Sequence, residues 1–325
     1  MTSRACKRTL LLTSILVSMV FHTANAEDVA LGENGFTRLK VSKAYVDLPS
    51  EKAVITILRE PYGETENRLW GESIEVAGGL RLHGLDTAPA DNTRFEVALN
   101  YLTADAKNRV SSSIPLGFFA IDGFGDANGT LGSVNTAVLD TNYKTWGIDL
   151  KVAKDVKVLG LEPLTLFTGL TYSNTVLAND FNLIEDGISS PVYLEDEIDT
   201  DYYGLFVGID AAYPLNQQLF FDFGGRLELL YADAQMAAQQ DFLPPIIMLN
   251  VNDSEDKIAG RVKAHLGLSY DLNPVVFGIG AAASYLSYQP YAEHPATVAD
   301  SLTPSHIEDD HMVGYTFNIS LNVAF

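Results

Sequence analysis

The sequence HMVGYTFNISLNVAF, from His311 to Phe325, ends the chain and decides the fold. Apolar side chains occupy every second position from Val313 to Phe325, with small or polar side chains between them. Successive side chains of a β-strand point to opposite faces. The alternation therefore predicts a strand with one apolar and one polar face, which finishes on an aromatic residue.

The first 26 residues predict export from the cytoplasm. Three basic residues precede an apolar run over residues 10–21, and small residues at 24–26 fit a signal peptidase site. The run is too short for a membrane helix, which needs about 20 apolar residues. We therefore expect residues 1–26 to be a cleaved signal peptide. Cys6, the only cysteine, lies within it, so no disulfide or thiolate metal site is expected.

These two ends resemble those of bacterial outer-membrane β-barrel proteins, a class whose last strand typically finishes on an aromatic residue. The resemblance implies that Tyr315, Phe317 and Phe325 form a signal read by the barrel assembly machinery. It also implies an integral outer-membrane location with a periplasmic C-terminus, in contact with membrane lipid and lipopolysaccharide. The resemblance covers the architecture and indicates no particular family.

The same alternation recurs in eight further segments, namely 74–82, 95–101, 146–152, 164–172, 203–213, 219–231, 258–270 and 275–285. Single-chain bacterial barrels have an even number of strands, so the segment 53–59 is predicted to be the missing first strand. We therefore predict an all-β, antiparallel, up-and-down transmembrane barrel of about ten strands over residues 53–325, with eight to twelve left open. Residues 27–52 would be a periplasmic lead or a plug.

In each predicted strand, the positions that alternate with the apolar ones would face the inside of the barrel. These inward positions carry charges of both signs. The predicted lumen network comprises Arg81, Glu96, Asp222, Arg226, Glu228, Arg261, Lys263 and His265. A simple antiparallel register across the turn at 84–92 puts Arg81 opposite Glu96. His265 is interpreted as a member of this network and not as a catalytic base.

Two functions are compatible with such a network. Paired charges that fill a narrow lumen would make the barrel a rigid frame for surface interactions, because buried charge must be paired. The same charges would otherwise line a narrow, water-filled channel and set its ion selectivity. A porin-like diffusion channel for small, cationic solutes is the alternative at a higher strand count.

The connections on the outer side are predicted to be long and acidic. The chain has a formal net charge of −21, and the predicted loops at 178–200, 233–256 and 289–311 contain acidic residues but no Lys or Arg. Such loops attract cationic ligands or a surface partner. Divalent cations such as Ca²⁺ or Mg²⁺ are a further expectation, since carboxylates are their preferred ligands.

Two other features of these loops need a separate explanation. His294, His306 and His311 share one predicted loop and raise the alternative of a transition-metal or pH-sensing site. The segment 242–249 is apolar, which is unusual for an outer loop. It is expected either to fold inward as a lid or to form a contact patch.

Two short patterns resemble the omptin family of outer-membrane proteases, whose members also have ten strands. Asp199-Thr200-Asp201 and Asp309-Asp310-His311 match the Asp-x-Asp and Asp-x-His pairs of that family. The second pattern enters the last strand and not an earlier one, and nothing else in the chain resembles that family. We therefore expect no enzymatic activity and no cofactor. The sequence offers no basic surface, so no nucleic-acid partner is expected either.

Overall fold

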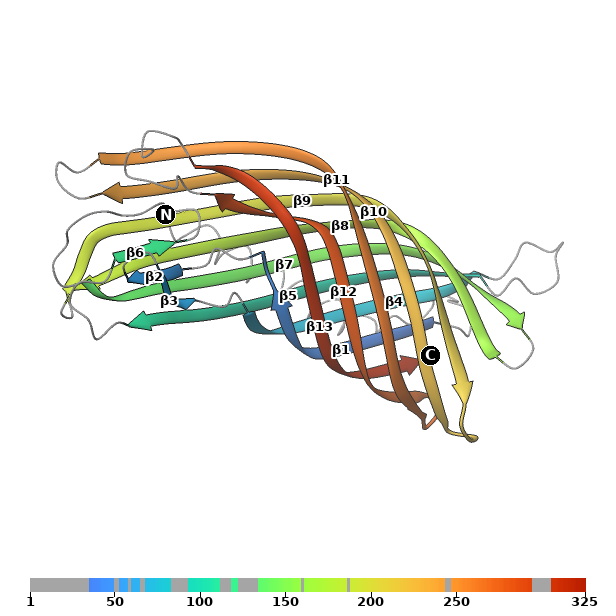
Figure 1. Cartoon of the computed structure of the whole chain (residues 1–325). Helices are drawn as coiled ribbons and strands as arrows, with labels where there is room; N and C mark the ends of the chain where they lie inside the picture. Colours follow the sequence, from blue (N-terminus) through green and yellow to red (C-terminus); the bar gives the residue numbers. More distant parts are fainter. Residues whose placement is uncertain are drawn as a thin grey trace, which may run out of the picture.

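The computed structural model describes residues 35–49, 53–57, 60–64, 68–82, 93–111, 118–121, 134–158, 161–185, 188–242, 247–293 and 305–325. Within these ranges no helix is long and apolar enough to cross a membrane. Their regular structure is thirteen strands (Figure 1): β1 (Gly35–Asp47), β2 (Ala53–Ile57), β3 (Glu60–Glu64), β4 (Arg68–Leu82), β5 (Thr93–Ser111), β6 (Phe118–Ile121), β7 (Val134–Val158), β8 (Leu161–Glu185), β9 (Ile188–Pro214), β10 (Leu219–Phe242), β11 (Ile247–Asp271), β12 (Val275–Glu293) and β13 (His306–Ala324).

Ten of these strands close into an antiparallel barrel in the order β1-β13-β12-β11-β10-β9-β8-β7-β5-β4. β1 pairs with both β13 and β4, which closes the wall. The end of the chain secures this seam, because the N–H of Gly35 donates to the carbonyl of Phe325 at 2.8 Å and the N–H of Phe325 donates back at 2.9 Å. The predicted all-β, ten-stranded antiparallel barrel is confirmed.

The identity of the first barrel strand differs from the prediction. Residues 27–52 are predicted to be a lead or plug, but β1 lies within them and forms part of the wall. The segment 53–59 is predicted to be the first strand, but β2 pairs with β3 and β6 in a separate three-stranded sheet. β1 lacks a clear signal because its outward positions carry Thr37, Lys43 and Asp47 as well as apolar side chains. The predicted signal peptide lies outside the described residues.

An apolar belt surrounds one part of the barrel. Leu205, Leu229 and Ile319 point outward, with 59%, 62% and 67% of their surface exposed. Rows of aromatic side chains bound this belt on both sides. In β9, the outward Tyr203 and Tyr213 stand ten positions apart, and about 9–11 residues of a tilted strand cross a bilayer. The belt therefore has the height of a membrane core.

The row of aromatic residues on one side of the belt runs around the barrel from strand to strand. Tyr45 packs edge-on against Trp70 at 5.1 Å between ring centroids, and Tyr172 lies 5.0 Å from Tyr203. We call this side of the belt the upper side. The lower side carries the short turns at 215–218 and 272–274, and Phe325 ends the chain there.

Above the upper aromatic row the wall continues as strand, where loops are predicted. β7 to β11 run for 24 to 27 residues each, and their side of the barrel extends far beyond β1 and β4 (Figure 1). The predicted loops at 178–200 and 233–256 are thus mostly paired strand. The predicted loop at 289–311 likewise contains the ends of β12 and β13.

The strand pattern inverts at the aromatic row, which explains why these extensions read as loops. The outward positions of β9 are apolar in the belt, at Leu205 and Val207, but acidic above it, at Glu197 and Asp199. Ile198 and the other inward side chains above the row are buried. Apolar side chains thus face outward in the belt, whereas above the aromatic row they face inward, as Ile198, Ala234 and Met236 do.

Candidate functional site: the charged lumen

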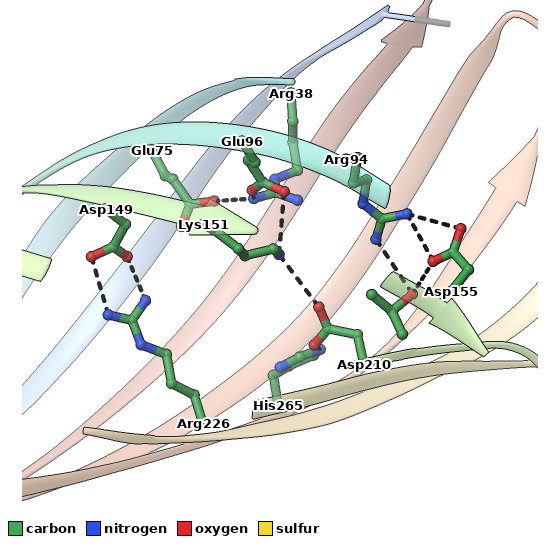
Figure 2. A network of polar contacts seen from close by, with 11 residues as sticks. Arg38, Glu75, Arg94, Glu96, Asp149, Lys151, Asp155, Asp210, Arg226 and His265 are labelled. Carbon is green, nitrogen blue, oxygen red and sulfur yellow. Dashed lines mark hydrogen bonds and ion pairs between the residues drawn. The ribbon is translucent and has the colours of Figure 1, made fainter. Parts of the chain in front are cut away.

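Ion pairs cross the lumen at the level of the belt. Arg38 of β1 donates to the carboxylate of Glu75 at 3.0 Å and to that of Glu96 at 2.7 Å. Lys151 of β7 lies 3.2 Å from the other oxygen of Glu96 and 3.6 Å from Asp210 of β9. β1 and β9 stand on opposite sides of the barrel, so these contacts link the two walls (Figure 2).

A second group of ion pairs is centred on Glu228, whose side chain is fully buried. Its carboxylate lies 2.9 Å from Arg226 Nε, 3.0 Å from Lys263 Nζ and 3.6 Å from Arg261 Nη1. Arg226 also binds Asp149 of β7 through both of its terminal nitrogens, in a two-pronged contact that Figure 2 shows. Such paired geometry is the strong form of the arginine–carboxylate contact.

A third group lies at the lower end of the network. Arg94 donates to Asp155 at 3.1 Å, and the hydroxyl of Thr165 donates to the same carboxylate at 2.7 Å. His265 Nε2 stands 3.7 Å from Asp210 Oδ1, which is outside hydrogen-bond distance. His265 therefore borders the network without a close partner among these residues.

Among the side chains that the structure describes, the network holds equal numbers of basic and acidic residues. Seven basic residues face the lumen at this level, namely Arg38, Lys40, Arg94, Lys151, Arg226, Arg261 and Lys263, and seven acidic residues accompany them, namely Glu75, Glu96, Asp149, Asp155, Asp210, Asp222 and Glu228. Unpaired charge in a water-poor interior is costly, whereas paired charge can be accommodated. The balance fits a lumen that is filled by its own side chains.

All residues of the predicted network occupy inward-facing positions of their strands, but one predicted pair is wrong. Glu96 stands opposite Gly79 and not Arg81, which faces Arg94, because the register is displaced by two positions from the simple turn. The side chain of Arg81 lies outside the described residues. Glu228 faces Arg261 and Arg226 faces Lys263 across β10 and β11, while Asp222 faces Gly267.

Arg38 is the main network member that the sequence reasoning misses. It makes two of the closest ion pairs in the lumen, but its strand carries no recognisable signal. The alternation of the predicted strands already places Asp149, Lys151 and Asp210 on the inward face, where the structure has them. The contacts between them depend on which walls face each other, and strand parity does not give that.

A cavity of about 300 Å³ lies next to the network, between the charges and the upper barrel. Its charged lining is Lys40, Glu75, Asp149, Arg226, Arg261 and Lys263, and Tyr143, Tyr202, Leu286 and Met312 are among its uncharged lining residues. Hydroxyl groups such as those of Ser173 and Thr175 also line it. The cavity thus joins a polar network to an apolar surface.

Apolar side chains fill the lumen above this cavity. One cluster comprises Tyr202, Leu230, Ala232, Ala259, Leu286 and Tyr288. A second lies on β9, β10, β12 and β13, and a third lies on the side of β1, β4, β5, β7 and β8. The hydroxyl of Tyr202 on β9 donates to the carbonyl of Tyr288 on β12 at 3.1 Å. Because two strands stand between β9 and β12 in the wall, this contact spans the interior. The upper barrel therefore has a packed core.

The outside of the upper barrel is acidic on the side of β9 to β11. The outward carboxylates there are those of Glu195, Glu197, Asp199, Asp201, Asp233 and Asp256. Outward positions of this described wall hold no Lys or Arg. Asp201 accepts hydrogen bonds from Tyr172 Oη at 2.7 Å and from Asn174 Nδ2 at 3.0 Å, and Asn174 also donates to Asp199.

The contribution of Asp199 to the stability of the folded protein depends on pH. Burial raises the pKa of the Asp199 carboxyl, and the charge of Asp201 adds to the rise. The folded state then holds this proton to higher pH than the unfolded state, so its stabilising contribution is lost as the pH rises from about 4 through the raised value. Over that range we expect Asp199→Asn to become more stable relative to the wild type, by less than about 1 kcal/mol, because the carboxyl is only partly buried and solvent screens its charge.

Denaturant unfolding of both proteins at several pH values measures this difference. A stability difference that stays constant with pH would contradict the assignment.

The two omptin-like patterns are not brought together by the fold. Asp199 and Asp201 lie on the outward face of β9, whereas Asp310 and His311 belong to β13, with three strands between them in the wall. His311 stacks on Tyr285, at 5.7 Å between ring centroids, and contacts Asp310 of its own strand. These side chains therefore share no cleft.

Comparison with solved structures finds bacterial outer-membrane barrels. The outer membrane protease OmpT from Escherichia coli matches with a TM-score of 0.50 and 11% identity, over 93% of this chain and 99% of that one. The translocator domain of the autotransporter NalP from Neisseria meningitidis matches with a TM-score of 0.41 and 11% identity, over 99% of this chain and 98% of that one. No family model and no curated protein matches the sequence. At this identity the likeness to OmpT concerns the fold alone.

Proposed function

We propose that this chain is an integral outer-membrane protein whose barrel is closed by its own side chains and serves as a rigid frame for the acidic upper wall. The observation that carries the proposal is the balanced ion-pair network beneath a packed apolar core. Narrow barrels have room only for their own side chains. Rigid support of the wall is the role that such a filled lumen serves best.

The exterior supports the membrane location. An apolar belt of bilayer height lies between two rows of aromatic side chains, such as Tyr203 and Tyr213, and aromatic residues are enriched at both membrane interfaces. A soluble protein would gain nothing from exposing so large an apolar surface. Bacterial barrels have short periplasmic turns, so the lower end and Phe325 would face the periplasm and the acidic wall would face outward.

The partners follow from this orientation. Outer-membrane lipid would cover the belt, and lipopolysaccharide would lie beside the upper wall. The outward Tyr315 and Phe317, with the terminal Phe325, would present the assembly signal to the barrel assembly machinery. The acidic outside of β9 to β11 would bind a cationic ligand or the basic surface of a partner, because the outward positions of this described wall hold several carboxylates and no Lys or Arg.

Planar bilayers test whether the lumen is closed. We expect the purified protein to show no large, stable open state, because ion pairs and apolar clusters occupy the lumen in series. Arg261→Ala, which widens the cavity but leaves the Arg38 and Arg226 contacts in place, is expected to stay silent as well. A stable conductance of the wild type would overturn the proposal.

The narrow-channel alternative rests on the cavity beside the network. A small solute that crossed the barrel would pass through this space, and acidic residues outside would favour cations. Conductance carried by cations in the wild type would support this alternative. The proposal assigns the chain no catalytic step, and cleavage of dibasic peptides by intact cells that produce the protein would contradict that part of it.

A further inference from the structure

Three side chains of metal-ligating types converge where β12 ends and β13 begins, above the aromatic row. His306 Nε2 lies 3.3 Å from Glu293 Oε2 and 3.3 Å from Glu308 Oε1. Glu293 and His306 are direct partners in the antiparallel register, and Glu308 follows two positions later on the same face. All three ligand atoms lie within 4.8 Å of one another.

The protein alone satisfies this cluster incompletely. A neutral imidazole has one N–H, so its Nε2 can donate to one carboxylate and leaves the second without a donor from His306. Two like charges at this separation also repel each other. A positive charge at the centre would remove both costs. That charge is either a proton on the imidazole or a bound cation.

The distances favour a metal ion as the cation. Zn²⁺ binds His nitrogen and Glu oxygen at about 2.0–2.2 Å in a tetrahedron, which places neighbouring ligand atoms about 3.3–3.6 Å apart. The two separations from His306 Nε2 match this edge. Ca²⁺ needs six to eight oxygen ligands, so one imidazole and two carboxylates suit a transition metal better.

We propose that Glu293, His306 and Glu308 bind a divalent transition-metal ion of the Zn²⁺ class. Three protein ligands leave the fourth position of the tetrahedron to water or to a group from a partner. The strands hold the ligands in register before the ion arrives, since the N–H of Ile307, between two of them, donates to Asp253 of β11 at 2.9 Å. Such preorganisation reduces the cost of binding.

A bound ion would join the ends of β12 and β13 directly at the base of the segment 294–304. It would thereby stabilise the last upper hairpin of the barrel, because a ligand that binds only the folded state adds to its stability. The site does not depend on whether the lumen conducts. It belongs to the upper wall, where each of the three side chains is 43–49% exposed.

Titration calorimetry of the purified full chain with Zn²⁺ at about pH 7.5 tests the site, because the imidazole must be neutral to bind a metal. We expect one saturable site per chain. His306→Ala is expected to weaken binding by more than about tenfold, since losing even a supporting contact behind a metal ligand costs 10–100-fold. Affinity should also fall as the pH is lowered to about 5.5.

His311→Ala is the matched control, because His311 is on the same strand and equally exposed but contacts one carboxylate, that of Asp310. It should bind Zn²⁺ as the wild type does. Equal affinity of the wild type and His306→Ala, no saturable binding by the wild type, or equal binding of Ca²⁺ would each overturn the proposal. Heat-modifiable migration on a gel verifies that each variant is folded.

Discussion

Glu228→Gln is expected to destabilise the folded barrel by about 3–5 kcal/mol, since removing one partner of a buried ion pair leaves the others uncompensated. Glu228 is fully buried and is the shared partner of Arg226, Arg261 and Lys263. Without its charge, three cations remain close together in a confined space, with Asp149 as the main carboxylate beside them. Guanidinium unfolding of the purified protein measures the loss.

Glu197→Gln is the control for this experiment, because Glu197 lies on the outer wall and is exposed. Exposed substitutions of this kind usually change stability by no more than about 0.5 kcal/mol. Equal effects of the two variants would mean that the lumen is well hydrated and that its ion pairs are screened. That result would favour the channel over the closed frame.

Leu227→Arg is expected to cost about 2–4 kcal/mol, the value for an arginine on the lipid face of a barrel near the bilayer midplane. Leu227 is 59% exposed and stands near the middle of the belt, between Phe221 and Tyr231 on β10. In a soluble protein the same change of an exposed side chain would be close to neutral. Unfolding of the protein from lipid vesicles measures the cost.

Gln235→Arg provides the comparison on the same face of the same strand. It lies above the aromatic row, where the outward surface is acidic and exposed, so its expected effect is small. A large cost for Gln235→Arg, or none for Leu227→Arg, would contradict the proposed position of the membrane.

The belt is the part of the fold that the sequence predicts well. The apolar parity of segments such as 203–213 and 258–270 indicates both the strands and the face that they expose. The final strand is equally clear, and Phe325 does bond to the strand that closes the barrel. In these regions the same alternation of apolar and polar residues continues over the whole segment, so it indicates a strand without ambiguity.

The remaining parts escape prediction for physical reasons. The upper wall reverses its apolar face at the aromatic row, so its acidic outward positions resemble loops. Lys43 interrupts the pattern of β1, and the loss of that strand hides Arg38. The partners of Glu96 depend on a register displaced by two positions and on contacts across the lumen. Strand periodicity carries no information about either.

Spin labels at two outward positions of β11 test the central claim most directly, namely that one face of a strand passes from lipid to water at the aromatic row. Leu266→Cys lies in the belt and Ser254→Cys lies above it, and the sequence has no other cysteine than Cys6. In vesicles, the label at 266 should be accessible to oxygen but not to a water-soluble nickel chelate, whereas the label at 254 should be accessible to the chelate. Equal accessibility to the chelate at both positions would contradict the account.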